Sequence, residues 1–296
     1  VRRHRGSDVG RTPAGALTML KQRVITAVVL LAIVLPALFA PVPLPFAALT
    51  LVFIAAAGWE WVRLNGGRSS SSIGSGLLLG GACALALGAG WEHSAPPSTW
   101  WAAMGVWVLG GSWALKAGPA GWGLLPAHLR WPLGLIGLWL AWLALASART
   151  QGINFILSIF SLVWVSDIAA YFGGRAFGKR KLALAISPGK SWEGVWSGML
   201  GVLLLALLWM QADRIWVLGS PSLFTQLHAQ HGVVGLVLVC IFLTAMGVVG
   251  DLVESLVKRH AGAKDSSGLL PGHGGVLDRV DALLPVFPLA LALSSV

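Results

Sequence analysis

Residues 19–34 read MLKQRVITAVVLLAIV and decide the fold class, because a short basic start gives way at once to an apolar run. The run continues to residue 40, which as a helix is long enough to cross most of a hydrocarbon core of about 30 Å. No small-residue cleavage site follows it and further apolar runs do, which predicts a retained spanning helix. Residues 1–18 are polar and irregular, so we expect a disordered extension, with Met19 the expected start of the natural chain.

Eight similar runs follow in this chain of 296 residues, which is 56% hydrophobic and only 11% charged. A soluble domain carries about 25% charged residues, so the composition indicates a polytopic membrane protein. No run alternates as a barrel strand does, and backbone groups in lipid must be paired within their own segment, so we predict an all-α transmembrane helical bundle. The predicted spans are 24–40, 43–62, 73–91, 99–115, 130–147, 152–172, 195–217, 232–250 and 279–296.

The basic residues predict one orientation of this bundle. Nineteen of the 21 Lys and Arg residues fall in the N-terminal segment or in connections on its side, which leaves only Arg149 and Arg214 on the other side. Because positive residues are retained in the cytoplasm, we expect a cytoplasmic N-terminus and cytoplasmic connections after the sixth and eighth spans. The net charge of +10 then reflects retention and attraction to anionic lipid headgroups, and no nucleic-acid partner is expected.

Seven of the eleven carboxylates gather at the predicted cytoplasmic ends of the last four spans or in their connections. They are Asp167, Glu193, Asp251, Glu254, Asp265, Asp278 and Asp281. An ionised side chain inside a membrane costs about 2.5 kcal/mol or more, so the cluster indicates a polar cavity, basic partners or bound cations. We therefore expect residues 19–150 to serve packing and lipid contact and residues 151–296 to form the functional region. Cys83 and Cys240 lie in apolar runs and predict neither a disulfide nor a metal site.

Helical spacing groups these polar residues further. One face of the eighth span carries Asp251, Glu254, Ser255 and Lys258. Asp167, Tyr171 and Arg175 repeat every four residues on the sixth span. The ninth span begins with Asp278 and Asp281 on one face and is too short to cross the hydrocarbon, so we expect Asp278 at or below the headgroup level in a cavity open to the cytoplasm.

Two connections have the composition of phosphate-binding elements. PGHGG at 271–275 leads into the ninth span, and a Gly-rich turn at a helix start presents amides to an anion, although an ordinary turn is the alternative. The segment 173–194 is basic and Gly-rich, which the positive-inside rule alone also explains. PGKS at 188–191 is not a P-loop, because Leu184 replaces the first Gly and we expect no strand before it; Ser191 is expected to cap the seventh span. Acids suited to Mg²⁺ beside cations suited to a polyphosphate favour a nucleotide that reacts with a lipid phosphate.

The longest motif of the chain lies in its C-terminal half and reads SLVKRHAGAKDSSGLLPGHGGVLDRVD at 255–281. It resembles, at every fixed position, the pattern S-x-x-K-R-x(4)-K-D-x(4)-[apolar]-P-G-H-G-G-x-x-D-R-x-D of the bacterial phosphatidate cytidylyltransferase (CDP-diacylglycerol synthase) family. DIAAYFGGRAFGKRKL at 167–182, SPGKSWEG at 187–194 and MLKQRVITA at 19–27 are also similar to family stretches. The one departure is the small Ala263 before Lys264, where a branched residue is expected.

The resemblance implies transfer of the cytidylyl group of CTP to phosphatidate with Mg²⁺, and possible use of a second cation, in the inner membrane of a bacterium. The catalytic residues that it implies are Asp251, Asp265, Asp278, Asp281, Lys264, His273 and Arg279. The substrate-binding residues are Ser187, Lys190, Glu193, Asp167, Ser255, Lys258, Arg259, Gly274 and Gly275. The metal ligands are Asp251 and Asp278 in the first place, with Asp265 and Asp281 as further ligands. CTP, phosphatidate and membrane lipids are the implied partners, together with a second copy in a homodimer.

Other functions remain open at this point. A secondary transporter places ionisable groups near the midplane and in both leaflets, whereas the outer side of this chain has few. A CTP-dependent lipid kinase needs a base for a hydroxyl group, and the 255–281 stretch favours cytidylyl transfer. The D-x-x-D-G-x-x-A-R pattern of CDP-alcohol phosphotransferases is absent, and a purely structural role leaves the clustered acids unexplained. Small-residue pairs at 76–80 and 194–198 predict close helix contacts, either within the bundle or in a dimer.

Overall fold

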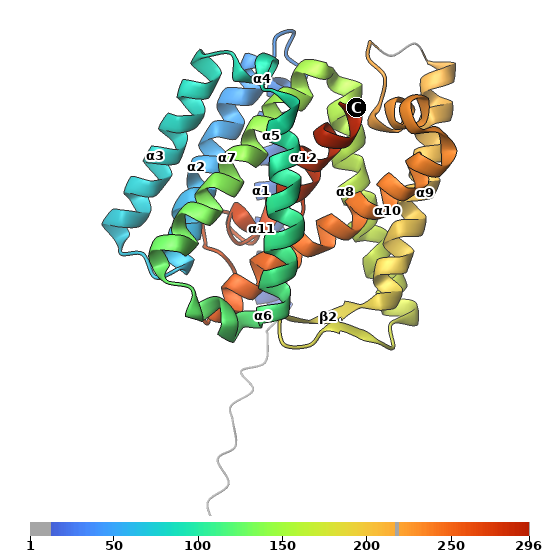
Figure 1. The fold of residues 1–296 in the computed structure, drawn as a ribbon. Helices are drawn as coiled ribbons and strands as arrows, with labels where there is room; N and C mark the ends of the chain where they lie inside the picture. Colours follow the sequence, from blue (N-terminus) through green and yellow to red (C-terminus); the bar gives the residue numbers. More distant parts are fainter. Residues whose placement is uncertain (1–12, 217–218, 296) are drawn as a thin grey trace, which may run out of the picture.

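The protein is a bundle of helices in which α10 crosses its neighbours obliquely (Figure 1). The computed structural model describes residues 13–216 and 219–295, with side chains from residue 21 onward. The first half contains α1 (Pro13–Leu38), α2 (Leu44–Leu64), α3 (Ser69–Gly88), α4 (Trp91–Ser94), α5 (Pro97–Gly105), the π-helix η1 (Val106–Gly110), α6 (Gly111–Leu124) and α7 (Ala127–Gln151). The second half contains α8 (Ile153–Phe177), β1 (Lys181–Ala183), β2 (Ser187–Ser191), α9 (Trp192–Ile215), α10 (Leu223–His260), α11 (Leu277–Val280) and α12 (Leu283–Ser294).

The helical class is confirmed, and all nine predicted spans coincide with helical structure. Seven helices in the described residues are long and apolar enough to cross a membrane, namely α1, α2, α3, α7, α8, α9 and α10. The predicted span 99–115 is divided among α5, η1 and α6, and the last one is met by α11 and the twelve-residue α12. At about 1.5 Å per residue α12 is roughly 18 Å long, less than the hydrocarbon thickness, so the count of nine stays a prediction.

The start of the chain differs from the expected disordered extension. The helix α1 begins at Pro13, so residues 13–18 are helical, whereas residues 1–12 lie outside the described part of the chain. The beginning of α1, the α8–α9 connection and the C-terminal end of α10 lie together at the bottom of Figure 1. This agrees with the assignment of these segments to one side of the membrane; that this side is the cytoplasm stays a prediction.

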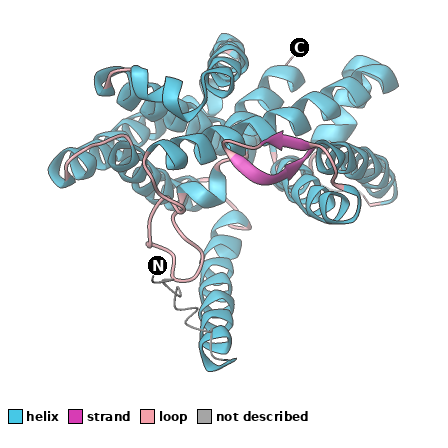
Figure 2. Ribbon diagram, turned by 90° about the horizontal axis from the view of Figure 1, so that it is seen from below, coloured by secondary structure: helices cyan, strands magenta, loops and turns pink. Residues whose placement is uncertain are grey.

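A two-stranded hairpin joins α8 to α9, where we expected no strand. The strands β1 and β2 pair antiparallel, with Lys181 opposite Ser191, and Figure 2 shows them across one end of the helices. Such a short hairpin is not stable alone and depends on its neighbours. Ser191 caps α9 as predicted, because its Oγ accepts a hydrogen bond from the Gly194 amide at 3.2 Å. The PGKS segment is therefore strand β2 rather than a phosphate loop.

Residues 261–276 turn back from the end of α10 into the middle of the bundle. They lead to α11, which lies near mid-height in Figure 1, and α12 continues from there to the far end. Non-helical backbone at such a depth is tolerated where protein surrounds it, and Val276 and Leu277 are buried. Asp278 lies on α11, and its position relative to the headgroups stays a prediction.

The small-residue pairs serve contacts inside the bundle. A Cβ added at Gly76 on α3 would lie 2.8 Å from the carbonyl oxygen of Ala55 on α2. A Cβ added at Gly198 on α9 would lie 3.0 Å from the carbonyl oxygen of Ser166 on α8. Glycine at these positions therefore allows α2–α3 and α8–α9 to approach closely, as small residues do between membrane helices.

Replacing Gly76 by Leu is expected to destabilise the protein, because the side chain meets the backbone of α2. Overpacking of this kind costs about 1–3 kcal/mol, which lowers the Tm by several degrees. The matched control is Gly74→Leu on the same helix, where an added Cβ meets nothing within 4 Å. Thermal unfolding of the two purified variants in detergent measures the difference. Equal Tm values would contradict close packing at Gly76.

Candidate functional site

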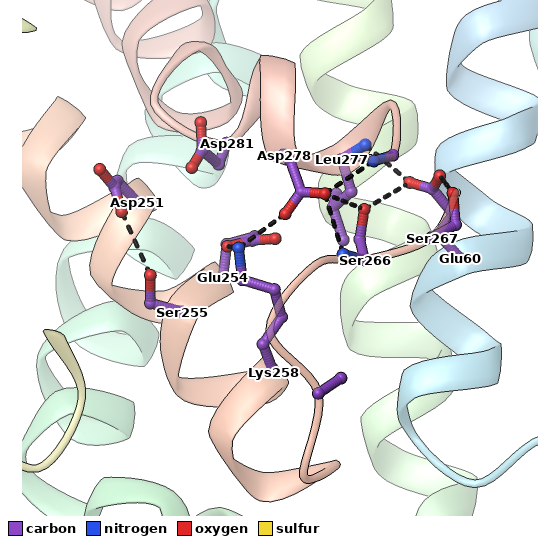
Figure 3. Close-up of polar contacts among 12 residues, drawn as sticks. Glu60, Asp251, Glu254, Ser255, Lys258, Ser266, Ser267, Leu277, Asp278 and Asp281 are labelled. Carbon is purple, nitrogen blue, oxygen red and sulfur yellow. Dashed lines mark hydrogen bonds and ion pairs between the residues drawn. The ribbon is translucent and has the colours of Figure 1, made fainter. Parts of the chain in front are cut away.

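The polar site is built along the C-terminal third of α10, as the helical spacing predicted. The hydroxyl of Ser255 donates to Asp251 Oδ1 at 3.3 Å, and Lys258 Nζ lies 2.6 Å from Glu254 Oε2. Figure 3 shows these side chains on the side of α10 that faces α11. Leucine and valine positions between them are buried, so packing of the apolar face of α10 fixes the direction of the polar face.

Lys258 connects this face of α10 to the signature segment. Its Nζ lies 2.6 Å from Asp278 Oδ1 as well as 2.6 Å from Glu254 Oε2, so one ammonium group lies between two carboxylates. The side chain of Lys258 is 12% exposed, and those of Glu254 and Asp278 are 3% and 6% exposed. Charge pairing compensates part of the cost of removing these groups from water.

Asp278 accepts hydrogen bonds through both oxygens. Besides the Lys258 contact, its Oδ2 accepts from the amide and hydroxyl of Ser266, both at 2.9 Å, and from the amide of Gly275 at 2.7 Å. These contacts from Lys258, Gly275 and Ser266 stabilise the ionised carboxylate and offset part of the cost of its burial.

The glycine turn before α11 brings backbone amides against these carboxylates. Gly274 has a φ of 82°, and a Cβ there would lie 2.6 Å from Asp278 Oδ2. A Cβ at Gly275 would overlap both Ser266 Oγ and Glu60 Oε1. The amide of Gly275 therefore serves an internal anion, Asp278, where the sequence analysis expected it to serve a substrate phosphate.

A second internal anion, Glu60 on α2, was missed by the sequence analysis. Its side chain is fully buried and accepts from the amides of Val276 at 3.0 Å and Leu277 at 2.7 Å. It also accepts from the hydroxyls of Ser266 at 3.1 Å and Ser267 at 2.5 Å, as Figure 3 shows. The available signal was a lone acid within an otherwise apolar span, which is a functional indicator in a membrane helix.

Further contacts tie the first half of the chain to this segment. Arg63, one turn after Glu60, donates to the carbonyl oxygen of Ser266. On α1, Arg23 Nε donates to the Gly272 carbonyl at 3.1 Å and Thr26 Oγ1 to the Pro271 carbonyl at 2.9 Å. Figure 2 shows α1 standing apart from the other helices, with the loop reaching toward it. The N-terminal helices thus hold the signature segment and do more than pack or face lipid.

A second polar cavity lies between α8, the hairpin and α10. It has a volume of about 470 Å³, and its polar lining includes Asp167, Arg175, Ser187, Lys190 and Asp251. Lys190 Nζ lies 2.5 Å from Asp251 Oδ2, so the hairpin is joined to α10 by an ion pair. The predicted residues of the 167–194 region are therefore brought to the same face of α10 as Asp251.

Asp281 lies between α11 and α12. Figure 3 shows it on the same side as Asp251, away from the contacts of Asp278. Asp278 is directed instead toward Ser266 and Lys258.

The remaining predicted residues differ in how far the structure engages them. Glu193 accepts from the amides of Lys179 and Arg180 at the base of the hairpin, so it orders that loop. Arg259 donates to the Ile186 carbonyl at 3.2 Å. The side chains of Lys264, Asp265 and Arg279 are exposed. His273 is half-buried, and its Nδ1 has no hydrogen-bond partner among the described residues.

The described residues contain no group of three or more His, Cys, Asp or Glu side chains arranged to hold one metal ion. The predicted set of Asp251, Asp265, Asp278 and Asp281 is therefore divided: Asp278 is bonded to Ser266 and Lys258, and Figure 3 shows Asp251 and Asp281 away from these contacts. The cysteines Cys83 and Cys240 are free and buried, as predicted.

Comparison with known proteins identifies the family. The model of the cytidylyltransferase family matches residues 21–296, and the phosphatidate cytidylyltransferase of Pseudomonas aeruginosa is 38% identical over 301 residues, which cover 93% of this chain and 97% of that protein. The chain belongs to the cytidylyltransferase family. The phosphatidate cytidylyltransferase of Haemophilus influenzae is 45% identical over 138 residues, which cover 47% of this chain and 44% of that relative. The phosphatidate cytidylyltransferase of Brucella suis is 44% identical over 133 residues, which cover 45% of this chain and 44% of that relative.

The substitution Glu60→Gln is expected to lower both the stability of the protein and its kcat/KM. The amide keeps one oxygen but leaves at least one of the Val276 and Leu277 amides unsatisfied, which costs about 1–3 kcal/mol. Because the segment also carries Asp278, we expect kcat/KM to fall by about tenfold to a hundredfold. Thermal unfolding and steady-state assays measure both effects. The control is Glu92→Gln on α4, and wild-type behaviour of Glu60→Gln would show that the Glu60 contacts are dispensable.

Proposed function

We infer that this protein transfers the cytidylyl group of CTP to phosphatidate and releases pyrophosphate and CDP-diacylglycerol. The observation that carries the inference is the 38% identity over nearly the full length of a phosphatidate cytidylyltransferase. The paired acids and lysines along α10 supply the chemistry that a reaction between two phosphates requires. The enzyme is thus a nucleotidyltransferase of phospholipid biosynthesis in a membrane.

The reaction needs positioning more than proton transfer. A phosphate oxygen of phosphatidate attacks the α-phosphorus of CTP, a new P–O bond forms, and the bond from the α-phosphorus to the bridging oxygen breaks as pyrophosphate leaves. The attacking oxygen is already ionised near neutral pH, so no strong base is needed. Alignment of the two substrates and neutralisation of charge supply most of the rate.

The side chains divide these tasks between two sides of α10. Arg175 and Lys190 line the cavity of about 470 Å³ and offer positive charge to the triphosphate of CTP. Lys258, held between Glu254 and Asp278, offers positive charge to the lipid phosphate. The exposed Lys264 and Arg279 are placed on the signature segment and its helix, from which they neutralise the pyrophosphate that leaves.

Mg²⁺ is the cation that this donor set fits best. It binds through one or two carboxylates together with substrate phosphates, so it does not require a preformed group of three acids. Asp251, which lines the polar cavity, would hold it together with Asp281, which Figure 3 shows on the same side, and the bound ion would neutralise charge on the phosphates of CTP. Asp278 would then support the site through Lys258 and the glycine turn, and Asp265 would act from the loop.

We further propose that the protein resides in the inner membrane of a bacterium, with the hairpin end of the bundle in the cytoplasm. The distribution of basic residues supports this orientation, and the relatives are bacterial proteins. CTP is made in the cytoplasm, so this orientation gives the site access to its nucleotide. A homodimer is the proposed assembly.

Purified protein in detergent is expected to form labelled CDP-diacylglycerol from labelled CTP and phosphatidate when Mg²⁺ is present. Chelation with EDTA is expected to stop product formation, and excess Mg²⁺ to restore it. Thin-layer separation of the lipid products measures turnover. Absence of CDP-diacylglycerol under every condition overturns the proposed function, and full activity in EDTA overturns the metal requirement alone.

Asp251→Asn is expected to lower kcat by roughly a hundredfold or more, because it removes a charge beside the reacting phosphates. The matched control is Asp213→Asn on α9. Asp213 accepts hydrogen bonds from Asn154, Ser222 and Thr225 away from the polar cavity, so its loss should lower the Tm and leave kcat of the folded protein intact. Comparable kcat values for the two variants would show that Asp251 takes no part in the reaction.

A further inference from the structure

An apolar cleft lies between the consecutive helices η1 and α6 on one side and α7 on the other, and it is separate from the polar cavity. Its volume is about 130 Å³ and its lining is almost entirely apolar. At its rim, Val106 and Leu133 are each 49% exposed and Trp113 is 45% exposed. These three apolar side chains are exposed in a chain with seven helices long enough to cross a membrane, and in such a chain an exposed apolar surface contacts lipid.

The wall of the cleft has two features that keep it open. One is the π-helix η1 (Val106–Gly110), a distortion that occurs frequently at functional sites. The other is a pair of glycines in the lining, Gly110 on η1 and Gly137 on α7, which have no side chain to fill the space. A Cβ added at either glycine meets nothing within 4 Å. The cleft is therefore free space beside two helices that could pack more closely.

The inner end of the cleft reaches the polar site. Glu254 and Leu277 line it, and their side chains are buried. Glu254 Oε2 lies 2.6 Å from Lys258 Nζ, so the inner end of the cleft adjoins the Lys258–Asp278 pair. A molecule in the cleft thus has lipid at one end and the Lys258–Asp278 pair at the other.

We propose that this cleft binds an acyl chain of phosphatidate and leads its phosphate to Lys258. The proposal rests on the proposed function and adds the route and seat of the lipid substrate. An apolar lining excludes CTP, and the lateral opening allows a chain to enter from the bilayer without leaving hydrocarbon. The small volume holds only part of one chain, so the rest of the lipid stays in the membrane.

The test fills the cleft without disturbing its walls. Gly137→Leu and Gly110→Leu place a side chain into the free space, and Gly81→Leu on α3 is the control, because Gly81 also has nothing within 4 Å and lies outside the cleft. Both cleft variants are expected to raise KM for dioleoyl phosphatidate by roughly tenfold, the lower end of what one methylene contributes in an apolar pocket. KM for CTP and the Tm are expected to change little.

A second measurement does not depend on turnover. Dioleoyl-type phosphatidate with a diazirine in one chain is expected to label peptides of α6 and α7, with less labelling in Gly137→Leu than in Gly81→Leu. Unchanged KM values together with labelling elsewhere overturn the proposal. Equal labelling by a phosphatidylcholine probe also overturns it, because the cleft would then hold bulk lipid. Failure of the proposed function would appear instead as wild-type protein without product, and the labelling result would still decide where phosphatidate binds.

Discussion

The compensation of buried charge by neighbouring charges and amides is the constraint on which this structure depends. Glu60 and Asp278 lie inside a helical bundle, where an isolated carboxylate is unstable. Together they accept hydrogen bonds from the amides of residues 266, 275, 276 and 277 and from the hydroxyls of Ser266 and Ser267. The same bonds satisfy the backbone of a segment that has no helix or sheet of its own. Anion and backbone therefore stabilise each other, and neither is stable there alone.

Two lysines neutralise the acids along α10 at two neighbouring places. Lys258 neutralises the acids near α11, and Lys190 neutralises Asp251 near the hairpin. Each lysine lies beside acids that the proposed function assigns to the reaction. In that function, the binding of a substrate phosphate or a metal ion would exchange one ion contact for another. Such exchange costs less than the exposure of unpaired carboxylates to an apolar interior.

Much of this site was predictable, but only where the information is local. Apolar run length predicted the helices, and the i, i+4 spacing predicted the contacts of Ser255 and Lys258 along α10. The role of Glu60 was not predictable, because no local pattern pairs α2 with a segment more than 200 residues later. The hairpin was missed because SPGKS lacks alternating apolar residues and is held by contacts with α9 and α10. For the same reason the glycine turn was assigned to a substrate phosphate when its amides bind internal carboxylates.

The contacts of Glu60 span 206 to 217 residues of sequence, and this separation has a consequence for biogenesis. The helix α2 leaves the ribosome early, whereas its partners are among the last residues to be made. During synthesis Glu60 therefore lacks these hydrogen bonds until residues 266–277 have been made. The final docking of residues 266–277 then completes the polar site and secures α1 and α2 in a single late event, so a nascent chain that stops short of this segment has neither.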